Sequence, residues 1–194
     1  MPLKADLHRY LRAAREAVLW KLDGLSEYDV RRPLTPTGTN LLGLVNHLAG
    51  VELLYFGIVF DRPIADPPSW LRQDAEPNSD LWVPAGQSRG SVIDLYHRAA
   101  EHSDATIAAL ELELDATGYV PWWSPELAKA PLHRVLIHVI AESHRHAGHA
   151  DLTRELIDGV VGLQHPNDFL PTRDASWWTT YRERVELNAK EATR

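Results

Sequence analysis

The sequence predicts an all-α protein, a four-helix bundle with long crossing loops and a short C-terminal helix. Four segments carry helical periodicity, and two irregular stretches separate them. No run of alternating β-branched residues is long enough to predict a strand with confidence. No repeat, low-complexity tract or long flexible linker divides the 194 residues, so we expect one domain over residues 1–194.

The first two helices are predicted from apolar residues at three- and four-residue steps. Gly24 and the stretch 33–38, with its proline and glycine, end the first helix. The second begins at about Thr39, taken as its N-cap, and continues to Ile58, after which Asp61-Arg62-Pro63 stops it. The apolar series of the first helix is Leu7, Leu11, Ala14, Val18, Leu22 and Leu25.

Two long connections cross the predicted bundle. The connection 63–87 is too long for a simple turn, and such loops are usually functional or packed over something. The second, 115–129, contains Pro121-Trp122-Trp123. Its tryptophans, together with Trp177-Trp178 near the C-terminus, either wall a pocket or fill the core.

The third and last helices are predicted from capping signals. The third should begin near Ser88 or Ser91, because Ser91 and Asp94 have the spacing of a capping box. The short last helix should begin at about Ser176, after a loop that contains Pro166 and Pro171.

The fourth helix is the longest and carries a polar stripe. It should run from about Ala130, with Pro131 near its first position, to Asp158, with Gly159 as its C-cap. On a helical wheel the stripe lies beside the core-facing residues, whereas His144 and Asp151 fall near the back and are expected on the surface. The stripe consists of His138, Glu142, His146 and His149.

This spacing suits a metal site. Glu142 and His146 are one turn apart and can share an ion, with a third ligand from another helix. His47 is the only histidine of the second helix and lies among apolar residues. The alternatives are that His47 is a hydrogen-bonded core residue and that Glu142 pairs with Arg145. His138 and His149 could support the ligands or lie on the surface.

Composition limits the classes of function. With 20 Lys and Arg against 27 Asp and Glu, the net charge of −7 and the lack of a basic block argue against nucleic-acid binding. The absence of cysteine excludes disulfides, Cys-ligated zinc and a cysteine nucleophile. We expect no signal peptide and no membrane-spanning segment, and therefore a cytoplasmic protein.

The chain resembles the DinB/YfiT-like superfamily, and more closely its actinobacterial branch of mini-circle, mycothiol-transferase-like proteins. The resemblance covers almost the whole chain. The segments that carry it are 38–52, 61–63, 120–123, 138–151, 154–159 and Trp177-Trp178.

The resemblance implies a four-helix bundle with a metal held by His47, Glu142 and His146. With Glu as the second of its three ligands, this triad is similar to that of the mycothiol-dependent maleylpyruvate isomerase relatives, whose zinc ligands are His, Glu and His. The superfamily pattern continues with Arg-Gly-Gln, where this chain has Ala147, Gly148 and His149. Whether His149 substitutes for a ligand or supplements one stays open.

Three protein ligands leave a coordination position free, which is typical of a catalytic site. Zinc is favoured for this donor set, and nickel, manganese or iron also fit it. The leading hypothesis is a metal-dependent thiol transferase, in which a small-molecule thiol such as mycothiol attacks an electrophilic substrate.

Two other classes remain as alternatives to thiol transfer. One is a metal-dependent hydrolase with His149 or His138 as general base, and the other is a non-catalytic metal-binding stress-response protein. Apolar helix faces leave a homodimer open.

Overall fold

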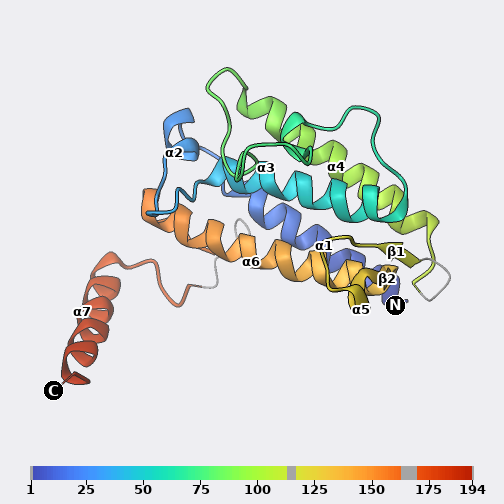
Figure 1. Ribbon diagram of the computed structural model, residues 1–194. Coiled ribbons are helices and arrows are strands. Elements are labelled where there is room, and N and C mark those ends of the chain that lie inside the picture. The colour runs from blue at the N-terminus through green and yellow to red at the C-terminus, as the bar shows by residue number, and fades with distance from the viewer. Residues whose placement is uncertain (1, 113–116, 163–169, 194) are drawn as a thin grey trace.

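The computed structural model describes residues 2–112, 117–162 and 170–193, and in them the chain is an all-α four-helix bundle (Figure 1). The bundle helices are α1 (Leu3–Trp20), α3 (Leu41–Glu52), α4 (Arg89–Ala109) and α6 (Leu132–Asp158). Helix α1 packs along α6 and α3 packs along α4, while α3 also contacts α6. The predicted fold class is therefore confirmed.

The second bundle helix begins one residue later than expected and changes type along its length, but it ends at the predicted stop. Asn40, not Thr39, is its N-cap, and the Asn40 side-chain oxygen accepts a hydrogen bond from the Gly43 N–H at 2.7 Å. The helix continues as a π-helical turn, Leu53–Gly57, and a 3₁₀ turn, Ile58–Phe60. Asp61, in the left-handed conformation with φ 55°, then ends it.

Helix α3 and its continuation are apolar because they form the core. Over Leu41–Phe60 the composition would suit a membrane span, but 83% of this window is buried inside the bundle. Its neighbours bury a matching set of apolar side chains from α1, α4 and α6. Burial among these helices accounts for the apolar character of the segment.

A buried ion pair joins α1 to α3. The Arg15 guanidinium donates to both carboxylate oxygens of Glu52, at 2.6 and 2.7 Å, and also to Asp104 of α4. Burial alone would lower the pKa of Arg15, but the two carboxylates outweigh it and raise that pKa. The first three bundle helices are thus held together by one guanidinium.

The predicted ends of the third and fourth helices are mostly right. Ser88 caps α4, accepting from the Ser91 N–H at 3.1 Å, so Ser91 lies inside the helix. Gly159, with φ 77°, is the C-cap of α6 as expected. Pro131 precedes α6 instead of lying within it.

Several short elements were not predicted. Strands β1 (Thr117–Tyr119) and β2 (Lys129–Pro131) pair antiparallel beside the start of α6. Three residues are too few to produce an alternating pattern. The remaining short elements are α2 (Glu27–Arg31), α5 (Pro125–Ala128) and the 3₁₀ turn Ser69–Leu71.

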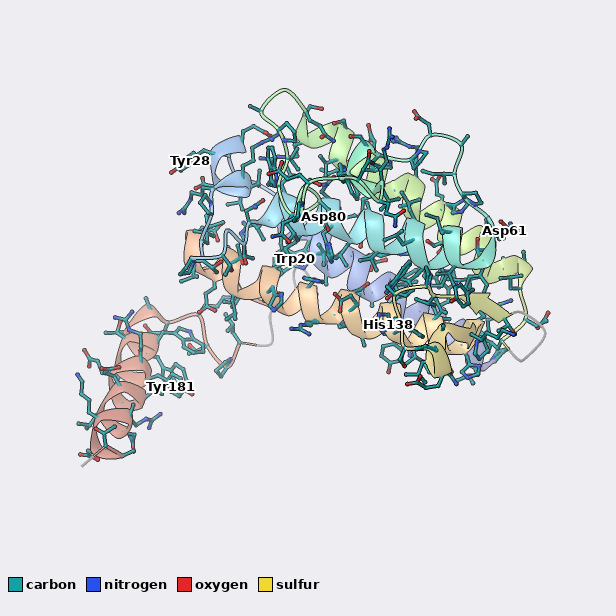
Figure 2. All side chains as sticks on the ribbon, in the orientation of Figure 1. Trp20, Tyr28, Asp61, Asp80, His138 and Tyr181 are labelled. Atoms are coloured by element: carbon teal, nitrogen blue, oxygen red, sulfur yellow. The ribbon has the colours of Figure 1, made fainter. Side chains whose placement is uncertain are left out.

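The C-terminal helix α7 (Ala175–Glu191) has 17 residues, so the expectation of a short helix was wrong. None of its residues is buried, and Figure 2 shows Tyr181 on α7, away from the bundle helices. Trp177 stacks on Tyr181, with ring centroids 5.2 Å apart. Trp177 and Trp178 therefore lie outside the described core, and Trp178 lines a cavity with Glu155 at the end of α6, far along the helix from Glu142. Pro166 lies outside the described residues.

Candidate metal centre

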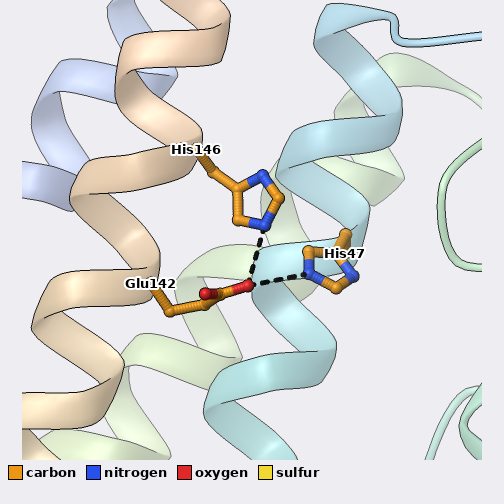
Figure 3. Close-up of side chains that lie close together, drawn as sticks. All are labelled: His47, Glu142 and His146. Carbon is orange, nitrogen blue, oxygen red and sulfur yellow. Dashed lines mark hydrogen bonds and ion pairs between the residues drawn. The ribbon is translucent and has the colours of Figure 1, made fainter.

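Helices α3 and α6 bring the three predicted ligands together (Figure 3). Nε2 of His146 lies 3.0 Å from Oε1 of Glu142, and Nε2 of His47 lies 4.0 Å from the same oxygen. One ligand atom from each residue lies within 4.8 Å of the other two. The rings of His47 and His146 meet edge to face, with centroids 4.8 Å apart.

All three side chains are half-buried, with exposures of 21% for His47, 30% for Glu142 and 14% for His146. Burial is the main cause that lowers the pKa of His146, and the neighbouring His47 adds to it, although Glu142 opposes both. The lowered pKa favours the neutral form of His146, in which an imidazole offers a lone pair to a metal.

Distances of about 2.0–2.2 Å from a tetrahedral zinc to N and O ligands imply ligand atoms about 3.3–3.6 Å apart. The separations of 3.0 and 4.0 Å around Glu142 bracket this range. Two imidazoles and one carboxylate on two rigid helices therefore fit a divalent metal.

His149 lies beside the triad and is exposed. Its Nδ1 is 3.4 Å from Nδ1 of His146, which is the ring nitrogen that does not face Glu142. His149 thus lies on the side of the His146 ring that faces away from Glu142. It is not one of the three residues whose donor atoms cluster.

His138 lies one turn before Glu142, in an aromatic cluster. Its ring centroid is 4.9 Å from that of Tyr55 and 5.0 Å from that of Trp123. Burial lowers the pKa of His138, and the opposing effect of Glu142 is smaller. The Tyr55 hydroxyl accepts hydrogen bonds from the indole N–H groups of Trp122 and Trp123, at 2.9 and 3.3 Å. The loop with these tryptophans thus packs against Tyr55 and His138, one turn before Glu142.

The expectation that His144 and Asp151 are surface residues holds only in part, because this edge of α6 faces α1 while the Asp151 side chain stays 39% exposed. Both are partly buried, and Asp151 forms an ion pair at 2.5 Å with Lys21, which has no exposed side-chain area. Glu142 was alternatively expected to pair with Arg145. In the structure Arg145 is exposed, and the carboxylate of Glu142 faces the two histidines instead.

Sequence reasoning missed Asp80. Its Oδ2 lies 2.6 Å from Nδ1 of His47, and the hydrogen bond to His47 lowers the pKa of Asp80, although burial opposes this. A cavity of about 210 Å³ beside His47 is lined by Asp80, by Trp70 and by part of α3. The small and polar residues at the start of and along α3 indicate that a segment packs against this face, but they do not identify Asp80; they are Asn40, Gly43, Asn46 and Gly50.

The comparisons agree with this geometry. The family model of mycothiol S-transferase matches residues 6–159, which contain α3, α4 and α6, all of α1 except its first three residues, and the triad. The sequence matches no curated protein. The match spans well over half of the chain, and the chain therefore belongs to the mycothiol S-transferase family, within the DinB/YfiT-like superfamily.

Proposed function

We propose that the chain is a metal-dependent thiol S-transferase that uses mycothiol or a similar small-molecule thiol against an electrophilic substrate. The observation that carries the proposal is the cluster of His47, Glu142 and His146, whose ligand atoms lie within 4.8 Å of one another. All three residues lie in the segment 6–159, which the mycothiol S-transferase family model matches. The chain has no cysteine, so the reacting sulfur must come from a second molecule.

The triad residues would hold the metal, and His47 and His146 would do so in their neutral forms. Zinc fits the donor set best, and nickel, manganese or iron are the alternatives that metal analysis would distinguish. A bound metal of this kind would favour the deprotonated form of a thiol. The triad side chains stay 14–30% exposed, so a small ligand would reach a metal held there from solvent.

His149 is the proposed general base. In the transfer, the thiol loses its proton, its sulfur forms a bond to the electrophilic carbon, and a leaving group departs or the adduct takes up a proton. His149 is exposed and one turn from the proposed ligand His146, so it can pass a proton to solvent. We place this chemistry in the cytoplasm, where low-molecular-weight thiols are kept reduced.

The test is a turnover assay with metal-loaded protein, mycothiol and a chlorodinitrobenzene. The sulfur replaces chloride on the ring, so thiol loss and chloride release should be equal. We expect turnover with the wild type and none with Glu142→Ala. A loaded protein that hydrolyses an ester without thiol would support a hydrolase instead. No turnover of either kind would support a non-catalytic metal-binding protein.

A further inference from the structure

The connection 63–87 lies directly against α3, on the side that carries His47. A Cβ atom added to Gly43 would lie 2.0 Å from the carbonyl oxygen of Leu81, and one added to Gly50 would lie 2.6 Å from the Trp70 ring. Only glycine allows such an approach, so these two positions let the connection sit on the helix.

Two asparagines hold the backbone of the same connection, namely Asn40, the N-cap of α3, and Asn46 within the helix. The Asn40 side-chain amide donates to the Leu81 carbonyl oxygen at 3.0 Å, and the Asn46 amide donates to the Asp80 carbonyl oxygen at 2.9 Å. These bonds locate Asp80 through its main chain. The Asp80 carboxylate is therefore free for another partner.

That partner is His47. Oδ2 of Asp80 lies 2.6 Å from Nδ1 of His47, on the opposite edge of the ring from Nε2, which faces Glu142. A carboxylate is an acceptor, so Nδ1 of a neutral His47 must carry the proton and Nε2 must carry the lone pair. Figure 2 shows Asp80 beside α3.

We propose that Asp80 is a positioning residue for the metal site, which holds His47 in the tautomer and ring orientation that present Nε2 to the ion. A carboxylate that accepts from a ligating imidazole raises the basicity of the ligand, and its loss typically costs about 10–100-fold in metal affinity. This inference rests on the proposed metal site. It makes the connection 63–87 part of the metal site that residues of α3 and α6 form.

The test is titration of the full-length, metal-free protein with Co²⁺, which also reports its ligands through its visible absorption bands. Asp80→Ala should weaken Co²⁺ binding about 10–100-fold and shift those bands. Asp80→Asn keeps the size and an uncharged acceptor, so its affinity should lie between those of the wild type and Asp80→Ala. Asp74→Ala is the matched control, because Asp74 lies in the same connection, is 77% exposed and pairs only with Arg72 among the ion pairs described.

The outcomes separate this inference from the proposed function. If the wild type binds no Co²⁺, both fail. If the wild type binds Co²⁺ and both Asp80 variants bind it with the same affinity and spectrum, only the role of Asp80 is overturned. If both variants lose helical circular dichroism along with the metal, Asp80 is a structural residue and the positioning role is also overturned.

Discussion

His47 and Glu142 face each other between α3 and α6, with Nε2 of His47 4.0 Å from Oε1 of Glu142. His146, one turn further along α6, lies 3.0 Å from the same oxygen. Two helices far apart in the sequence thus present three metal-ligating groups to one point. The packing of these helices, and not a local loop, creates the site.

The role of His149 can be separated from that of the ligands. If His149 is the general base, His149→Ala should keep its metal and its Co²⁺ affinity, while kcat for thiol transfer falls about 10²-fold at pH 7. If His149 instead orients His146 through their 3.4 Å contact, metal affinity falls as well. Measuring both quantities on the same preparation decides between the two roles.

The close approach of the connection 63–87 to α3 predicts opposite effects of two glycine substitutions. Gly43→Ala should lower the free energy of unfolding by about 1–3 kcal/mol, because the new methyl group meets the Leu81 backbone and must displace it. Gly148→Ala is the control, since its Cβ meets no atom within 4 Å in the interior of α6. It should raise the free energy of unfolding by about 0.5–1 kcal/mol. Equal effects in urea unfolding would contradict the described contact.

The buried pair of Arg15 and Glu52 predicts a large loss of stability when one charge is removed. Arg15→Met should cost about 3–5 kcal/mol, because Glu52 is only 1% exposed and would keep an uncompensated charge. The double variant Arg15→Met with Glu52→Leu should recover part of the loss. A single variant as stable as the wild type in urea unfolding would show that the pair does not hold α1 to α3.

The metal-free protein should lose stability as the pH falls below about 6.5. Burial lowers the pKa of both His138 and His146, so the unfolded chain takes up protons at a higher pH than the folded chain does. The contribution of these two histidines to the free energy of unfolding is therefore fully present above the ordinary histidine pKa. It is lost as the pH falls through their lowered pKa values. Unfolding curves of metal-free protein from pH 7.5 to 5 would measure this. His138→Phe should reduce the slope, and an unchanged slope would contradict the role of His138.

The bundle could be predicted because its signals are local. The apolar steps from Leu7 to Val18, the stop at Asp61-Arg62-Pro63 and the C-cap Gly159 depend on residues within one or two helical turns. The predicted end of the first helix at Gly24 was late, because α1 ends at Trp20. The strands at Thr117–Tyr119 and Lys129–Pro131 were missed because each is only three residues long. That residues 1–194 form one domain stays a prediction.

The site was predictable only in part. The spacing of Glu142 and His146 placed two donors on one face of α6, and the family resemblance added His47. No local pattern links Asp80 to His47, because their contact depends on the path of a long connection over α3. The same reason explains Asp151, whose partner Lys21 lies at the end of α1.

The central claim is tested most directly by the metal content of protein purified without added metal. Plasma mass spectrometry should find about one divalent ion per chain in the wild type and in Arg145→Ala, an exposed neighbour on α6. Glu142→Ala should lose the ion and keep its helical circular dichroism. A wild type that carries no metal, even after incubation with zinc, nickel, manganese or iron, would contradict the account, as would a Glu142→Ala variant that retains the full amount.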